Sequence, residues 1–233
     1  MTDLHSHILP GVDDGSESVA ESIEMLRLEA AQGISHVVAT PHFYPHHDTP
    51  EQFFSRRSRA EAALRQEMAR HSGLPTVEVG AEIYYFRGMS DSDLLPELTI
   101  GGKNCILIEM PPAPWPDSAI EELASIRRKR GITPIVAHID RYIGPFRTYG
   151  IPERLEALPV LVQANAEFFL ERRTARMAMK MLKAGRIHLL GSDCHHISER
   201  SPNLGPALER IAGKLGPEAL ERIRSCARHI LEF

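Results

Sequence analysis

The residues with the clearest chemical potential are histidines and carboxylates that follow short apolar runs. His5 and His7 end the first run, and both imidazoles should project from one face because side chains alternate along a strand. Further candidate ligands recur downstream: Asp14, His42, Glu82, Glu109, His138, Asp193 and His195. Neutral imidazoles and carboxylates suit manganese, iron, cobalt or zinc, and no thiolate is needed. These nine side chains exceed the needs of one tetrahedral ion, so the set predicts two or three metal ions.

Charge predicts what such a site would attract. The four carboxylates are Asp14, Glu82, Glu109 and Asp193. Three divalent ions would leave the site with a net charge of about +2 before hydroxide binds, which attracts a phosphate dianion, and would lower the pKa of bound water from about 15.7 to roughly 7. Any one of the nine side chains could be structural when taken alone. Their recurrence after successive apolar runs favours a shared phosphoesterase site.

Apolar, β-branched runs alternate with longer amphipathic segments along the chain. Strands are expected at 2–5, 35–40, 76–83, 104–110, 133–138, 160–164 and 187–190, and helices at 17–32, 50–71, 117–130, 167–184, 202–214 and 217–231. Ser16 would cap the first helix and Gly33 would end it. Seven strands separated by helices or irregular turns predict an α/β fold with a parallel sheet. Active sites of α/β barrels lie at the carboxyl ends of the strands, where all nine candidates fall.

Composition excludes several classes of protein. The 233 residues suit one domain spanning 1–233, with 42% hydrophobic and 25% charged residues. The net charge of -4, without a long run of like charge, gives no electrostatic reason to expect nucleic acid or a membrane as a partner, and we expect neither nucleic-acid binding nor membrane insertion. We expect no transmembrane helix or signal peptide, and therefore a cytoplasmic protein. Three widely spaced cysteines form neither a disulfide framework nor a cysteine-based zinc site.

A competing motif lies between Cys194 and Arg200, whose Cys-x5-Arg spacing is that of cysteine-dependent phosphatases. In those enzymes, a tight loop of backbone amides binds the phosphate and lowers the pKa of the thiol. The loop here contains no glycine, and Glu199 would repel phosphate. The motif also uses His195, which the metal site needs. The cysteine mechanism is therefore the less favoured alternative.

The ordered motifs resemble the PHP (polymerase and histidinol phosphatase) superfamily. The most specific match is DLHSHILPGVDDGS at residues 3–16, and further matches follow at 39–42, 80–84, 108–109, 138–142 and 191–195. The resemblance is strongest to bacterial manganese-dependent tyrosine phosphatases of capsule and exopolysaccharide operons, and it extends to about residue 205. One departure is Ile139-Asp140, where that family commonly has Pro and Glu. The shorter acid could shift Arg141 slightly, but no ligand is lost.

The resemblance implies a single PHP domain folded as a distorted (β/α)7 TIM-like barrel that carries three divalent ions. Manganese is the expected metal, with iron, cobalt or zinc as alternatives. The implied ligands are His5, His7, Glu82 and Asp193 for the first ion, bridging Glu82 with Glu109 and His138 for the second, and Asp14, His42 and His195 for the third. Arg141 and Arg200 match the family's catalytic, phosphate-binding arginines, and a planar guanidinium can grip phosphate oxygens bidentately.

The implied activity is hydrolysis of phosphotyrosine on proteins by metal-bound hydroxide. The implied partner is a bacterial tyrosine autokinase that controls polysaccharide export. Six aromatic residues fall in or near the active-face loops and could flank an aromatic leaving group, although rim packing is favoured for most: Phe43, Tyr44, Tyr84, Tyr85, Trp115 and Tyr142. Two further alternatives stay open: a small-molecule phosphate monoesterase similar to histidinol phosphatase, and a non-catalytic scaffold. A deep narrow pocket would favour the former, and a lack of bound metal the latter.

Overall fold

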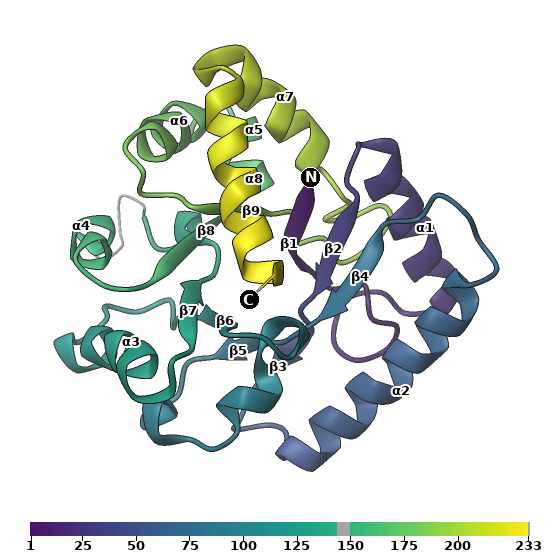
Figure 1. Cartoon of the computed structure of the whole chain (residues 1–233), viewed down its shortest axis with the longest axis horizontal. Helices are drawn as coiled ribbons and strands as arrows, with labels where there is room; N and C mark the ends of the chain where they lie inside the picture. The colour runs from purple at the N-terminus through teal and green to yellow at the C-terminus, as the bar shows by residue number, and fades with distance from the viewer. Residues whose placement is uncertain (144–149, 233) are drawn as a thin grey trace.

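The computed structural model describes residues 1–143 and 150–232 as an α/β fold with parallel strands (Figure 1). One sheet has the order β1-β2-β4 and the other the order β3-β5-β6-β7-β8-β9. The strands are β1 (Thr2–Ser6), β2 (His36–Ala39), β3 (His42–Phe43), β4 (Thr76–Val79), β5 (Glu82–Tyr84), β6 (Cys105–Glu109), β7 (Thr133–Val136), β8 (Leu161–Asn165) and β9 (Leu189–Gly191). The expected α/β class and parallel pairing are confirmed.

Two kinks in the chain divide the strands into two sheets, because β2 leads directly into β3 and β4 directly into β5. Between β2 and β3 lie Thr40 and Pro41, and between β4 and β5 lie Gly80 and Ala81. Backbone bonds continue across these kinks, from Gly80 N to Ala39 O at 2.9 Å and from Glu82 N to Pro41 O at 3.0 Å. The expected strand 35–40 therefore ends at a kink, whereas the expected strand 76–83 is divided by one into β4 and the first residues of β5.

The strands curl so far that β1 of the first sheet meets the end of β9 of the second. Asp193 N donates to His5 O, and His7 N donates to Cys194 O, both at 2.8 Å. Ser6 and Cys194 also form an isolated parallel bridge. These bonds bring the residues that follow β9 beside those that follow β1, although the two segments are far apart in sequence.

The helices surround the curled sheet, and α8 lies over it (Figure 1). They are α1 (Val19–Ala31), α2 (Pro50–Met68), α3 (Asp117–Arg130), α4 (Ile151–Glu156), α5 (Ala166–Leu170), α6 (Ala175–Lys183), α7 (Leu204–Leu215) and α8 (Pro217–Glu232). Short 3-10 turns lie at η1 (Met89–Asp91), η2 (Leu95–Leu98), η3 (Ile100–Gly102) and η4 (Ile139–Arg141). Among the described residues, no helix combines the length and the apolar character that crossing a membrane requires.

Two apolar cores hold these elements. Inward-facing strand residues such as Leu4, Leu107 and Leu189 form the smaller core, which Ala227 and Ile230 of α8 also join. The outward faces of the strands pack against the surrounding helices in a larger cluster. Because the smaller core includes part of α8, which contacts β1 and β9, this helix covers the inner strand residues.

Local details differ from the expected elements. Ser18, not Ser16, caps α1 by accepting a hydrogen bond from Glu21 N. The hydroxyl of Ser16 instead donates to Ser18 O at 2.9 Å. The expected helix 167–184 divides into α5 and α6 because the backbone turns extended at Glu171. We did not expect α4. It begins directly after Gly150, whose backbone is in the left-handed conformation.

Gly191 gives a test of how tightly β9 packs against β1. A Cβ placed there would lie 2.5 Å from His5 Cβ and 2.9 Å from Gln163 Nε2. We expect Gly191→Ala to lower the free energy of unfolding by about 1–3 kcal/mol, measured by denaturant titration.

The matched control is Gly213→Ala, because a Cβ at this position in α7 meets nothing within 4 Å. Alanine is the better helix former, so this change should stabilise the protein by up to about 1 kcal/mol. Equal effects of the two substitutions would contradict the close approach.

Candidate metal centre

The first group of candidate ligands gathers where β1 ends. The Nε2 atoms of His5 and His7 lie 3.1 Å apart, as expected for side chains on the same face of the chain. Glu82 Oε2 lies 3.2 Å from the former and 3.4 Å from the latter. Asp193 Oδ1 approaches the same two nitrogens at 3.5 and 3.4 Å. These atoms are close enough together for one ion to bind several of them.

The second group surrounds the other side of Glu82. His138 Nε2 lies 2.7 Å from Glu82 Oε1 and 3.7 Å from Glu109 Oε1. His42 Nδ1 lies 2.9 Å from Glu82 Oε2. Because both of its oxygens face imidazoles, Glu82 lies between two ligand groups, as a bridging carboxylate would.

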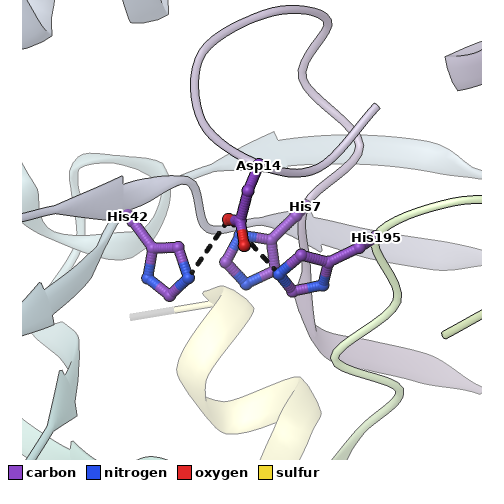
Figure 2. Close-up of side chains that lie close together, drawn as sticks. All are labelled: His7, Asp14, His42 and His195. Carbon is purple, nitrogen blue, oxygen red and sulfur yellow. Dashed lines mark ion pairs between the residues drawn. The ribbon is translucent and has the colours of Figure 1, made fainter. Parts of the chain in front are cut away.

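The third group includes Asp14, from the loop after β1 (Figure 2). Its Oδ1 lies 3.6 Å from His42 Nε2 and 3.6 Å from His195 Nε2. Ligand atoms of His7 also fall within 4.8 Å of this group. The structure therefore brings together all nine side chains expected from the sequence: His5, His7, Asp14, His42, Glu82, Glu109, His138, Asp193 and His195.

The unsatisfied polar atoms of the cluster fit bound cations. In the described part of the chain, four buried atoms of the cluster make no hydrogen bond of good geometry, although the first two lie 2.9 Å apart: His42 Nδ1, Glu82 Oε2, Glu109 Oε2 and His138 Nδ1. Buried polar atoms are normally paired, because an unpaired one loses its hydration without compensation. Nitrogen and carboxylate lone pairs that converge in this way suit manganese, iron, cobalt or zinc.

Electrostatics keep the central carboxylates ionised. Burial would raise the pKa of Glu82, but His5, His138 and His42 outweigh it and hold that pKa well below its usual range. Burial opposes ionisation of Asp193 too, yet His5 and His7 lower its pKa strongly. Glu82 and Asp193 are therefore ionised at neutral pH, which is the form in which a carboxylate binds a cation.

The two expected arginines lie at the edge of the cluster. Arg141 Nη2 donates to Asp193 Oδ2 at 2.5 Å, and Arg200 Nη2 lies 2.8 Å from Asp193 Oδ1. Arg200 also contacts His195 Nε2 at 3.0 Å. Their side chains are 37% and 43% exposed, so a ligand arriving from solvent can reach both guanidinium groups.

Backbone strain is concentrated at this cluster. Among the described non-glycine residues, those with positive φ are His138 (30°), Asp193 (54°) and Arg200 (52°). Such conformations are costly for side chains with a Cβ and persist where the surrounding structure imposes them. All three residues are site candidates, which indicates that the fold accepts strain to aim these side chains.

Sequence reasoning missed the residues that hold the candidates in place. Gln163 Oε1 accepts from His138 N at 2.6 Å and lies 3.4 Å from His5 Nδ1. The Gln163 amide then donates to Asn165, which donates to Asp193 Oδ2 at 2.9 Å. Both amides are buried on β8, at alternate positions that share one face. This i, i+2 pair of amides was the one available signal in the sequence.

Asp13 plays a similar part on the opposite side of the cluster. Its Oδ2 lies 2.7 Å from His7 Nδ1 and accepts from His42 N at 2.8 Å. A carboxylate on the far nitrogen of a ligating histidine fixes the tautomer and the orientation of the ring. Asp13 therefore leaves His7 Nε2 free to face the cluster.

The thiol of Cys194 faces away from the candidate ligands. It is fully buried, and its Sγ lies 4.0 Å from Glu29 Oε1. Burial, followed by the acids Glu29 and Asp3, raises the pKa of this thiol well above its usual value. A buried, protonated thiol is a poor nucleophile, which argues against the cysteine mechanism.

Comparisons with known proteins agree with this arrangement. Tyrosine-protein phosphatase YwqE of Bacillus subtilis (strain 168) is 30% identical over 226 residues, covering 94% of this chain and 86% of that protein. Tyrosine-protein phosphatase CpsB of Streptococcus pneumoniae is 28% identical over 233 residues, covering 96% and 94%.

A solved structure shares the fold. It comes from a study described as crystal structures of YwqE from Bacillus subtilis and CpsB from Streptococcus pneumoniae, unique metal-dependent tyrosine phosphatases. The TM-score is 0.83 at 24% identity, over 100% of this chain and 94% of the other. The profile of the family described as capsular polysaccharide synthesis, CpsB/CapC, matches residues 1–232. Because this match covers nearly the whole sequence, the chain belongs to the CpsB/CapC family.

Proposed function

We propose that this chain is a metal-dependent protein-tyrosine phosphatase that hydrolyses phosphotyrosine on proteins. The observation that carries the proposal is the convergence of nine imidazoles and carboxylates beside two arginines. Relatives of the same family are named tyrosine-protein phosphatases, which supports the choice of substrate. The physiological substrate would be a bacterial tyrosine autokinase that regulates capsule or exopolysaccharide production in the cytoplasm.

The proposed ligand sets follow the three groups of atoms. His5, His7, Glu82 and Asp193 would hold the first ion; Glu82, Glu109 and His138 the second; Asp14, His42 and His195 the third. Manganese is the proposed metal, although iron, cobalt and zinc accept the same donors. His7 also approaches the third group, and His42 the second.

The proposed frame for these sets is a distorted (β/α)7 barrel in a single domain spanning 1–233. The backbone bonds between the ends of β1 and β9 support closure of the sheet. The kinked pairs β2/β3 and β4/β5 would each count as one strand path. All the candidate ligands would then lie at one rim, where barrel enzymes place their active sites.

The residues of the chain have separate tasks in this proposal. When bound, divalent ions supply Lewis-acid stabilisation of phosphate oxygens and lower the pKa of water. Arg141 and Arg200 bind the phosphate oxygens and stabilise the charge that develops on them. Asp193 contacts both guanidinium groups and thereby holds them beside the candidate ligands.

The openness of the site favours a protein substrate over a small enclosed metabolite. The side chain of Asp14 is 69% exposed, and both arginines are partly exposed at the same edge. A phosphotyrosine that projects from a protein surface can enter such a mouth. The small-molecule phosphatase alternative would be favoured by a narrower and deeper pocket.

The first prediction concerns the requirement for metal. Protein stripped with chelator should release no phosphate from a phosphotyrosine peptide, and Mn²⁺ should restore release equally in wild type and Cys194→Ser. The reason is that the thiol is buried and protonated, whereas the metal ligands are intact. Activity that persists without metal and disappears in Cys194→Ser would instead establish the cysteine mechanism.

The second prediction concerns Arg200. Replacing a preorganised donor that stabilises transition-state charge typically lowers kcat by about 10²–10³-fold, and Arg200→Ala should fall in that range. Metal content should be measured alongside, because Arg200 also contacts His195.

The matched control for Arg200→Ala is Arg186→Ala. Arg186 forms surface ion pairs with Glu153 and Glu156, neither of which is a candidate ligand. Its removal should leave kcat unchanged. An Arg200→Ala variant with wild-type kcat would remove this residue from the mechanism.

The third prediction concerns Gln163. Gln163→Leu keeps the side-chain volume roughly constant but leaves His138 N without its acceptor and His5 Nδ1 without its neighbour. Loss of such support typically weakens metal binding by about 10–100-fold. Calorimetric titration of stripped protein with Mn²⁺ measures this affinity, and circular dichroism checks that the variant is folded. A folded variant with unchanged affinity would show that the amide does not position the ligands.

A further inference from the structure

Two tyrosines continue the ligand-bearing faces of β3 and β5. These strands pair in parallel with His42 opposite Glu82. Side chains two positions further along a strand return to the same face, so Tyr84 at the end of β5 lies on the face of Glu82, and Tyr44, directly after β3, continues the face of His42. Tyr84 is in turn paired with Glu109 of β6.

Ring contacts support this placement. The Tyr44 ring stacks on His42 with centroids 4.9 Å apart and an interplanar angle of 29°. The Tyr44 and Tyr84 rings are 5.7 Å apart. The exposed His46 lies 5.9 Å from the former ring and 5.7 Å from the latter. The two tyrosines, with His46 at their outer edge, thus form a continuous aromatic surface beside the cluster.

Other aromatic residues near the site already have structural roles. Phe43 is buried against Phe53, and Tyr85 donates its hydroxyl hydrogen bond to Glu122. Tyr142 accepts from Met110 N and packs against Trp115, and both rings are buried. Tyr44 and Tyr84 are half-buried, so part of each side chain remains accessible.

We propose that Tyr44 and Tyr84 form an aromatic wall that binds the phenyl ring of the substrate's phosphotyrosine. This inference rests on the proposed phosphatase function and adds a basis for its selectivity. With the phosphate beside the ligands and arginines, an aryl group attached to it would extend past His42 toward the wall. Aromatic rings attract one another at centroid separations of about 4.5–7 Å. A phosphoserine side chain has no ring to offer, so the wall favours aryl over alkyl phosphates.

The test compares two non-hydrolysable probes, phenylphosphonate and methylphosphonate, bound to manganese-loaded protein. Wild type should bind phenylphosphonate more tightly, by about tenfold for one good ring contact. Tyr44→Leu and Tyr84→Leu should each reduce that ratio toward one, with little change for methylphosphonate. Tyr44→Phe and Tyr84→Phe should keep the ratio, because they keep the rings. Phe54→Leu, which removes a partly buried aromatic residue on α2, is the matched control.

Four outcomes would overturn the wall. The ratio of the two affinities could stay at its wild-type value in both leucine variants. The affinity for methylphosphonate could also fall in parallel with that for phenylphosphonate, which would mean that the tyrosines only support His42. Wild type could also bind both probes equally or bind neither. Failure of the phosphatase proposal is distinguishable: the affinity ratio would behave as expected while manganese-loaded wild type released no phosphate from phosphotyrosine peptides.

Discussion

The constraint on which the structure depends is the burial of one carboxylate among histidines. Glu82 is 1% exposed, and its oxygens lie 2.7 Å from His138, 2.9 Å from His42, 3.2 Å from His5 and 3.4 Å from His7. A buried charge is tolerated only when it is paired or coordinated. These imidazoles come from β1, β3 and the segments that follow β1 and β7. These elements must therefore converge around Glu82 for its buried carboxylate to be ionised.

Two kinds of local irregularity meet that demand. The kinks at residues 40–41 and 80–81 come immediately before His42 and Glu82, and backbone bonds bridge them, so the strand paths bend without losing their pairing. The strained backbone at His138 and Asp193 turns two further candidates inward. Around them, Gln163 and Asp13 fix ring orientations. Rigid support of this kind lets a ligand cluster keep its geometry when substrate arrives.

Much of this could be predicted from sequence, because the ligands follow strands at regular places. The spacing of His5 and His7 alone requires a shared face, and parallel strands that end together require convergence. The supporting residues were missed because nothing in the sequence distinguishes Gln163 from any other polar residue on a strand. Its role follows only from its contact with His138 N in the folded chain. Helix details failed for a related reason: whether Ser16 or Ser18 caps α1 depends on hydrogen bonds that only the folded chain provides.

The central claim is that this cluster, and no other acidic group, binds the metal. Asp3, Glu29 and Cys194 form a second buried group with suitable atoms, but burial and Asp3 raise the pKa of Glu29 to about 10, which makes that group a poor anion. Anomalous diffraction from crystals grown with Mn²⁺ measures the positions directly. The account predicts peaks around Glu82, between the imidazoles and carboxylates that surround it. A peak at Cys194, or none beside Glu82, would contradict it.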